Sequence, residues 1–517
     1  MDGLSPLEIK RRVKKKPYLR TQLVLPSQKI QDKLPSPSSM FPSGARYYAD
    51  RNTGNGIRID AFKNISKLLV KNASFKHNGT GLPTAMAPHN KFIAIGTSHS
   101  LVIVFDHFEE VRIVLGSMEN TADGAVTSID FSMDNDGYLV CGYYSGKVVL
   151  WDVIGGKELK IIQDAHDSPI INVRFWPAST SAVSIVSVDM QGRINLFTFL
   201  KRLFTWSVDR RCLINESTGQ KVALCVLPRK SKSRAPDKGK CGSAEPQLLA
   251  FSTHSDTYLV SLYPEPRILK RWSKPGNVTA GELPCLSLGW SLAWQTNKLE
   301  KAKSTAGRDL HPSLCRGWDR YLQIVAVQSP VGSVEGDCQF NVSHVFCTDL
   351  PIVLVDWVCE KRIVYMNTEH IFVVLDLISG TEVEAVNLES ASLAYATLPS
   401  GKINDENVGG TKHLLSTTCA HVQSYFNSVR ACDSRIYVLG QKDLRCVSIQ
   451  SWQNQVKILQ RNGDWIEALL LALENYKLEK KSIGEVSEYD SDLTNHVNRE
   501  GKQAMNGAND SLVADLL

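Results

Sequence analysis

The sequence lacks the motifs that mark the common enzyme classes. Its 517 residues contain no Gly-x-x-x-x-Gly-Lys-Ser phosphate loop, no His-Glu-x-x-His motif and no Gly-x-Ser-x-Gly turn. The 12 cysteines are spread singly, and none forms a Cys-x-x-Cys pair or another metal-ligand spacing. The sequence therefore offers no catalytic residue, cofactor site or metal site, and predicts a protein that is not an enzyme.

Long hydrophobic runs are also missing. The longest apolar stretches, such as residues 371–375, are far shorter than the ~20 residues that span a bilayer. The polar, basic N-terminus has no apolar signal segment behind it, and cysteines in apolar runs, such as Cys141, are expected to be reduced thiols. The pattern predicts a cytoplasmic protein whose membrane contact is at most peripheral.

Charge of one sign is scarce, because 59 basic and 53 acidic residues leave a formal net charge of only +6. Two basic clusters supply much of it, one in residues 229–240 and one near the N-terminus. The body is near neutral, so no nucleic-acid-binding face is expected. The N-terminal cluster is either part of a solvated tail or a contact for acidic lipid, and consists of Arg11, Arg12, Lys14, Lys15 and Lys16.

A repeat of 46 residues is present from about residue 83. Residues 93–106 (IAIGTSHSLVIVFD) align without a gap with residues 139–152 (LVCGYYSGKVVLWD), so that Gly142, Trp151 and Asp152 match positions 96, 105 and 106. A third copy follows at the same step, where Gly192 matches Gly146. A step of 40–50 residues carrying several strands is typical of propeller blades.

The fold class predicted is mainly β, a seven-bladed degenerate WD-type β-propeller over residues 83–450, with six or eight blades as alternatives. Ser145-Gly146 is predicted to form a hairpin turn. The strand 148–151 is apolar throughout, so Trp151 is expected to pack between blades. Residues 1–82 are predicted to be a disordered basic and Pro/Ser-rich tail. Residues 229–245 are predicted to be a mobile loop insertion.

His166, in Asp-Ala-His-Asp-Ser-Pro, is assigned a structural role. In WD repeats a histidine in this position belongs to a buried hydrogen-bond network with Ser/Thr, Asp and Trp, and Asp189 occupies the turn that could complete it. Phe197 stands where the Trp would be, and the blade with Trp151 has no matching histidine. We therefore expect a propeller that relies on packing rather than on complete networks.

After residue 450 the spacing of apolar residues becomes helical. Trp452 begins one predicted helix, Gly463 ends it, and the following Asp-Trp-Ile-Glu, with Trp465 and Glu467, begins a second. The apolar face expected on the second helix consists of Trp465, Leu469, Ala472, Leu473 and Tyr476. Such a pair is the αα-hairpin unit of an α-solenoid, predicted over residues 451–484 and followed by a polar disordered tail, 485–517. The tail leaves open a truncated or alternative product.

Two parts of the chain resemble a known family. The first part consists of residues 139–163, the Asp-Ala-His that follows and SVDMQGRIN from residue 187, and the second of Ser451-Trp452-Gln453 and GDWIEALLLA from residue 463. Both resemble the vacuolar protein sorting-associated protein 8 family. The resemblance implies a subunit of the CORVET tethering complex on the cytosolic face of early endosomes. Its propeller would engage a GTP-loaded early-endosomal Rab GTPase, and its solenoid would bind the complex core. The long solenoid and the C-terminal zinc domain of that family are missing here, which leaves assembly with other CORVET subunits open.

A propeller followed by a helical pair is also typical of other proteins. The sister family of the HOPS complex shares the propeller-plus-solenoid plan and acts in late-endosomal and vacuolar fusion. Coat and ciliary-transport scaffolds are more distant alternatives. An enzyme with a site in the central channel of a propeller belongs to a different class, although no clustered carboxylates support it.

Overall fold

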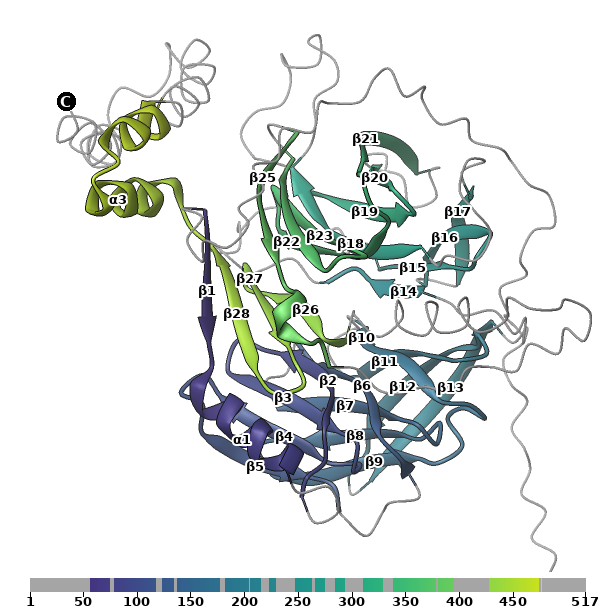
Figure 1. The fold of residues 1–517 in the computed structure, drawn as a ribbon. Coiled ribbons are helices and arrows are strands. Elements are labelled where there is room, and N and C mark those ends of the chain that lie inside the picture. Colours follow the sequence, from purple (N-terminus) through teal and green to yellow (C-terminus); the bar gives the residue numbers. More distant parts are fainter. Residues whose placement is uncertain are drawn as a thin grey trace, which may run out of the picture.

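The strands in the described part of the chain form seven four-stranded antiparallel sheets in the computed structural model. Figure 1 shows the sheets arranged around a common axis as blades, and the predicted seven-bladed β-propeller is confirmed. The structure describes residues 56–74, 79–117, 123–133, 137–176, 182–203, 205–214, 223–228, 247–262, 266–274, 284–292, 310–328, 338–377, 380–394, 427–473 and 476.

Each of the first six blades uses four consecutive strands, running from the axis outward. Blades 1 to 3 are β2 (Pro83–Pro88), β3 (Phe92–Thr97), β4 (Val102–Asp106), β5 (Val111–Leu115); β6 (Val126–Phe131), β7 (Tyr138–Tyr143), β8 (Val148–Asp152), β9 (Lys157–Ile162); and β10 (Ile170–Trp176), β11 (Ala182–Asp189), β12 (Ile194–Lys201), β13 (Trp206–Ile214). Blades 4 to 6 are β14 (Ala223–Val226), β15 (Leu248–Ser252), β16 (Asp256–Ser261), β17 (Arg267–Ser273); β18 (Cys285–Leu292), β19 (Leu310–Trp318), β20 (Tyr321–Gln328), β21 (Gln339–Cys347); and β22 (Ile352–Cys359), β23 (Arg362–Asn367), β24 (Ile371–Asp376), β25 (Thr381–Asn387).

Burial follows the position of a strand within its blade. The innermost strands β2 and β6 and the third strand of blade 1, β4, are buried at every position. The outermost strand β9 has no fully buried residue. An inner strand is covered on both faces because blades stack against one another, and it therefore reads as a continuous apolar run rather than as an alternating one. This explains why the repeat is clearest in the inner strands.

Trp151 lies between the first two blades. Its side chain is only 4% exposed and packs in a core that includes Val104 of blade 1 and Leu139 of blade 2. The repeated glycine has a packing role: a Cβ on Gly142 would lie 2.6 Å from Ile170 of the next blade. Glycine therefore recurs where the inner strand of the following blade approaches most closely.

The N-terminal boundary predicted at residue 83 is wrong. β1 (Ile57–Ala61) is the outermost strand of blade 7 and pairs with β28 (Leu444–Ile449), with Ile57 opposite Ile449. The same sheet contains β26 (Val429–Cys432) and β27 (Arg435–Leu439). Blade 7 therefore takes three strands from the end of the propeller and one from its beginning, which closes the ring. The Pro/Ser-rich composition of the preceding residues concealed this short strand.

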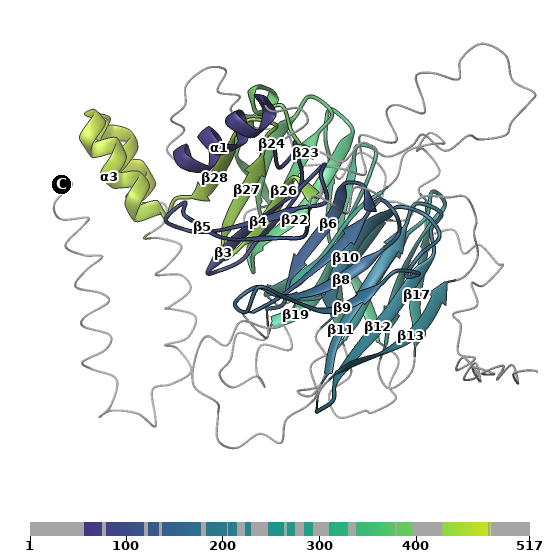
Figure 2. The ribbon, with the colours of Figure 1, turned by 90° about the horizontal axis from the view of Figure 1, so that it is seen from below.

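The helix α1 (Lys63–Ser74) also lies inside the region predicted to be disordered. Its buried Ile65 and Leu69 pack in a core with Phe105 of blade 1 and Tyr437 of blade 7. Ser66 Oγ donates to Phe62 O at 2.6 Å and accepts from Leu444 N at 3.2 Å. The helix therefore covers the seam between the first and last blades, as Figures 1 and 2 show.

The described residues after the propeller form two helices. After a single 3₁₀ turn at Glu389–Ala391 and the strands of blade 7, α3 (Trp452–Asn462) projects from the ring beyond β28 in both Figure 1 and Figure 2. Residues 465–473 form a second helix that packs on α3 through Ala468 and Ala472. Within the described ranges, no helix has the length and apolar character needed to cross a membrane.

Candidate functional site

Charged side chains from innermost strands are connected at the axis of the ring. Arg430 of β26 donates from Nη2 to Asp130 Oδ1 of β6 at 2.7 Å and from Nη1 to Ile129 O at 3.0 Å. Arg174 Nη1 of β10 lies 3.7 Å from the same Asp130 Oδ1, and Phe175 N donates to Asp130 Oδ2 at 2.8 Å. Asp130 thus joins blade 2 to blade 3 and also to blade 7, on the far side of blade 1.

A second carboxylate, Asp356 of β22, connects the last three blades. Its Oδ1 accepts from Ser287 Oγ of blade 5 at 3.0 Å and from Trp357 N at 2.9 Å. Its Oδ2 accepts from Ala431 N of blade 7 at 2.9 Å. Each oxygen of this part-buried carboxylate therefore has a donor, as burial of a charge requires.

Asn427 bridges blades from the loop that precedes β26. It is 4% exposed, and its Nδ2 donates to Thr127 O of blade 2 at 3.0 Å and to Ile171 O of blade 3 at 3.3 Å. Its Oδ1 accepts from Ser128 Oγ at 3.2 Å. Asn427 thus joins blade 7 to blades 2 and 3 through bonds to a side chain and to the backbone. We call Asp130, Arg174, Asp356, Asn427 and Arg430 the axial network.

The axial network contains two basic and two acidic side chains, so its formal charges cancel. Burial and the positive charge of Arg430 lower the pKa of Arg174 to about 10, although Asp130 and Asp356 oppose the shift. Arg174 therefore remains protonated near neutral pH. Two cations and two anions held in a water-poor centre favour a fixed relative placement of the blades.

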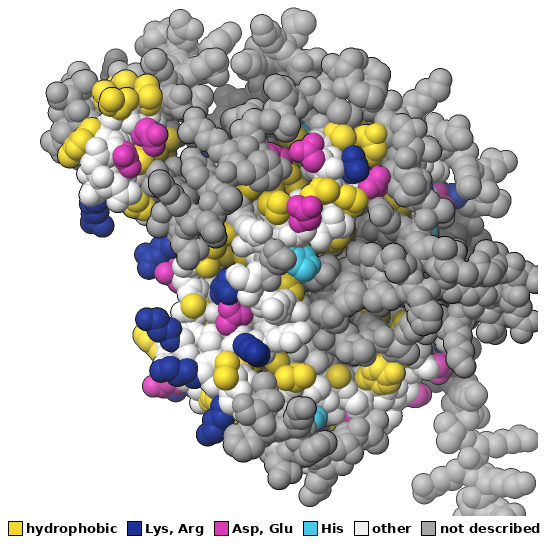
Figure 3. All heavy atoms as spheres, viewed as in Figure 1, with side chains coloured by type: hydrophobic (Ala, Val, Ile, Leu, Met, Phe, Trp, Pro, Cys, Tyr) yellow, Lys and Arg dark blue, Asp and Glu magenta, His cyan; other side chains and the backbone are white. Residues whose placement is uncertain are grey.

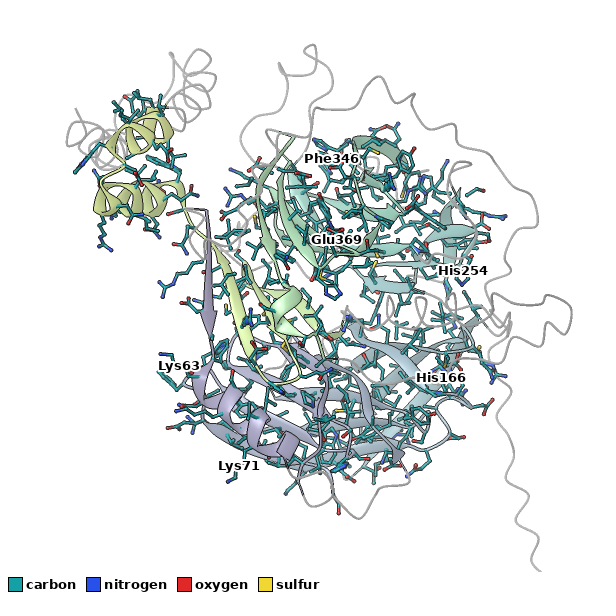
Figure 4. The ribbon with its side chains drawn as sticks, in the orientation of Figure 1. Lys63, Lys71, His166, His254, Phe346 and Glu369 are labelled. Atoms are coloured by element: carbon teal, nitrogen blue, oxygen red, sulfur yellow. The ribbon has the colours of Figure 1, made fainter. Side chains whose placement is uncertain are left out.

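His166, Ser187 and Asp189 are brought together in blade 3 (Figure 4 labels His166). His166 Nε2 lies 2.7 Å from Ser187 Oγ, and Nδ1 lies 3.2 Å from Asp189 Oδ2, with both the His166 and Asp189 side chains fully buried. Burial raises the pKa of Asp189, but hydrogen bonds from His166 and from the backbone of Arg193 outweigh it, and the pKa is lowered. Full burial of both side chains supports the structural role predicted for His166.

Phe197 takes the place of the tryptophan in this blade. Its ring meets the His166 ring edge-on, with centroids 6.5 Å apart and an interplanar angle of 75°. In blade 2, by contrast, Trp151 has no histidine partner. The two halves of a WD network thus lie in different blades, and packing replaces the missing bonds.

The remaining repeat positions form turns. Gly146 and Gly192 both have φ of 86° in the turns before β8 and β12, a conformation that side chains disfavour. A Cβ on Gly146 would also lie 2.2 Å from His166 O. Asp152 Oδ1 accepts from Gly155 N at 3.0 Å and so fixes the turn after β8.

At the junction with the helices, Ser451 caps α3 by accepting from Asn454 N at 3.3 Å. Gly463, with φ of 86°, ends it, and its N–H and that of Asp464 bond back to carbonyls of the last turn. Trp452 is partly buried against this pair, whereas Trp465 and Glu467 are exposed. Trp465, expected on the buried face, is 56% exposed because Ala468 and Ala472 make the contact with α3.

The basic cluster Arg11–Lys16, the insertion 229–245 and the tail 485–517 lie outside the described residues. Within the residues that the structure does describe, no group of three His, Cys, Asp or Glu side chains is placed to hold a metal ion.

Sequence reasoning missed the axial network. A signal exists, because Asp130, Arg174, Asp356 and Arg430 are each a lone charge in a short, otherwise mostly apolar strand. Their partners are up to 301 positions away, so the pairing itself could not be predicted from the sequence.

Glu384 of β25 yields a pH prediction. This buried carboxylate accepts hydrogen bonds from the backbone of Gly56 and Ile57, and burial raises its pKa from 4.5 to about 7 despite those bonds. The folded state therefore holds the proton more tightly than the unfolded state. Its stabilising contribution is full below about pH 4.5 and is lost as the pH rises through about 7.

We expect the unfolding midpoint of the wild type to fall relative to that of Glu384→Gln between about pH 5 and pH 8. Thermal melts across this range measure the difference. Glu110→Gln, at an exposed position, is the matched control and should track the wild type. A constant difference between wild type and Glu384→Gln would contradict the raised pKa.

Comparison with known proteins identifies similar chains. The family profile described as the Vps8 β-propeller matches residues 55–448. The vacuolar protein sorting-associated protein 8 homologs of Mus musculus and Homo sapiens are 25% and 26% identical over 438 and 442 residues, and each match covers 83% of this chain and 28% of the relative. The Drosophila melanogaster homolog is 25% identical over 445 residues, covering 86% of this chain and 33% of the relative. The chain thus spans about a third or less of these relatives.

Proposed function

Because the chain belongs to the Vps8 β-propeller family, we propose that it is an endosomal tethering scaffold whose propeller binds a GTP-loaded early-endosomal Rab GTPase within a CORVET-like complex. In this proposal the protein acts on the cytosolic face of early endosomes and has no catalytic turnover. The family assignment supports the trafficking role, and the partner follows from the resemblance.

The axial network is the observation that supports binding over catalysis. Asn427 and Arg430 reach from blade 7 to blades 2 and 3, so the polar side chains of the axial network are already bonded within the protein. Cross-linking through the centre also favours a rigid ring. A rigid ring with turns on both rims suits recognition of another protein.

Nucleotide dependence is the property that distinguishes this proposal from a general adhesive surface. The switch loops of a small GTPase are ordered by the γ-phosphate and released after hydrolysis. A rigid rim that recognises those loops binds the GTP state alone. A single copy is expected to bind weakly, because tethers gain avidity from assembly and membrane contact.

A pull-down of the full chain against Rab GTPases tests this proposal. We expect capture of early-endosomal Rabs loaded with a GTP analogue and little capture of the same Rabs loaded with GDP. Late-endosomal Rabs in both nucleotide states are the matched control. Equal capture of both states would overturn the proposal, and capture of late-endosomal Rabs alone would favour a HOPS-like role.

A further inference from the structure

Three successive blades present a large apolar side chain at the tip of the same turn. Phe108 between β4 and β5, Ile154 between β8 and β9, and Leu203 between β12 and β13 are 83%, 74% and 94% exposed. Each turn joins the third strand of a blade to the fourth. In antiparallel blades of equal order, these turns emerge on one face of the ring. Phe108 and Ile154 are also 46 positions apart and so are equivalent in the repeat.

The turns of these blades lie side by side. A Cβ on Gly156, in the turn of Ile154, would lie 2.6 Å from Ile113 of β5, so this turn packs on blade 1. Trp206, directly after the turn of Leu203, meets Tyr138 of blade 2 edge-on with centroids 5.8 Å apart. The three tips therefore belong to one continuous part of the rim. We call Phe108, Ile154 and Leu203 the apolar tips.

The turn that carries Phe108 is rigid. Asp106 Oδ1 accepts from Phe108 N and from Glu110 N, both at 2.9 Å. Glu109 has φ of 67°, a conformation that costs free energy for a residue other than glycine. Its carboxylate accepts from Asn64 N at 2.5 Å and Ile65 N at 3.2 Å at the start of α1. The turn thus keeps the Phe108 ring exposed to solvent, at a cost in backbone free energy at Glu109.

Basic side chains border the apolar tips. Lys63, Lys67 and Lys71 follow one another at helical spacing on the exposed side of α1, which begins beside the turn of Phe108. Figure 4 labels the first and the last of them, and Figure 3 shows Lys and Arg side chains along this edge of the molecule. The exposed Lys201 and Arg202 directly precede Leu203.

The carboxylates of the Phe108 turn are already engaged within the protein. Asp106 Oδ2 accepts from Arg112 Nε at 2.8 Å, Glu110 lies 3.6 Å from Arg112, and Glu109 caps α1. Among the ion pairs of the described residues, none includes Lys63, Lys67 or Lys71. The positive charge of this edge is therefore available to an anionic surface.

We propose that this face docks on an anionic phospholipid surface, with the apolar tips entering the headgroup region and the neighbouring lysines and arginine contacting lipid phosphates. Single apolar side chains on separate turns suit insertion between lipids, which fill the space around each tip. Basic residues near an anionic leaflet are attracted by its negative surface potential. This inference does not depend on the identity of a Rab partner, and it places membrane contact on the folded ring as well as on the basic tail.

Vesicle flotation of the full chain tests the proposal, using neutral phosphatidylcholine vesicles and vesicles that also contain phosphatidylserine. Arg11, Arg12, Lys14, Lys15 and Lys16 are replaced by Gln in every protein, so that the tail does not mask the ring. Phe108→Ser/Ile154→Ser/Leu203→Ser removes the tips. Tyr144→Ser/Val342→Ser/Val383→Ser removes three exposed apolar side chains elsewhere on the ring and is the matched control. Thermal melts verify that both triple variants fold.

We expect binding to the phosphatidylserine vesicles alone, weakened about tenfold or more by loss of the tips and unchanged in the control. Lys63→Glu/Lys67→Glu/Lys71→Glu should also weaken binding, and added salt should reduce it. Equal binding by the tip variant would overturn insertion. Absence of vesicle binding, together with reduced Rab capture by the tip variant, would show that the face is a protein contact and would also overturn the proposal. Rab capture in solution tests the proposed function separately.

Discussion

A chain that begins at residue 83 is expected to lose the cooperative unfolding transition of the propeller. It lacks β1 and α1, and therefore the burial of Ile57, Ile65 and Leu69. Burying an aliphatic side chain contributes about 1.5–3 kcal/mol, so the loss is roughly 5–9 kcal/mol. That is comparable with the total stability of a typical domain, about 5–15 kcal/mol. The edge of β28 is also left unpaired.

Thermal unfolding followed by circular dichroism, with gel filtration for aggregation, checks this expectation. The matched control is a chain that begins at residue 55, which keeps β1 and α1 and removes only the residues before them. It should melt like the full chain. An unchanged midpoint for the chain that begins at residue 83 would show that blade 7 closes the ring without its fourth strand.

Asp130→Ala is expected to destabilise the propeller by about 3–5 kcal/mol, because it leaves Arg430 in a water-poor centre without its carboxylate. The two side chains are only 12% and 16% exposed. The ion pair between Asp60 and Arg58 on β1 is the matched control, since both side chains are more than half exposed. Asp60→Ala should change the free energy of unfolding by about 0–1 kcal/mol.

Urea unfolding of both variants measures the difference, and the double variant Asp130→Ala/Arg430→Ala completes a mutant cycle. Removal of both partners should cost less than the sum of the single changes, because Arg430 is then no longer left without its carboxylate. Equal losses for Asp130→Ala and Asp60→Ala would contradict the role assigned to the axial network.

The blades were readable from the sequence because their signals are local. The 46-residue step, the turn at Gly146 and the apolar strand before Asp152 lie within one or two blades, and the structure forms strands and turns at these positions. The burial of inner strands on both faces explains their continuous apolar character. Local packing rules were therefore sufficient to predict the architecture.

Features that depend on distant partners were not readable. β1 is five residues long, with a burial pattern of one buried position followed by mostly exposed ones. Nothing within its neighbourhood distinguishes it from a tail, since its partner β28 comes from the other end of the propeller. The pairs of Asp130 and Asp356 likewise join residues from separate blades. For Trp465 the local pattern itself was insufficient. Helical spacing predicted an apolar face that includes Trp465, but the contact with α3 is made by Ala468 and Ala472.

Ring closure by β1 also sets an order of events during synthesis. Arg58 and Ser448, which face each other in the finished sheet, are 390 positions apart. At about 5–20 residues per second, the first strand leaves the ribosome roughly 20–80 s before its partner exists. The seam between the first and last blades therefore forms last, and until then the nascent chain exposes an unpaired strand and the apolar side of α1 to chaperones.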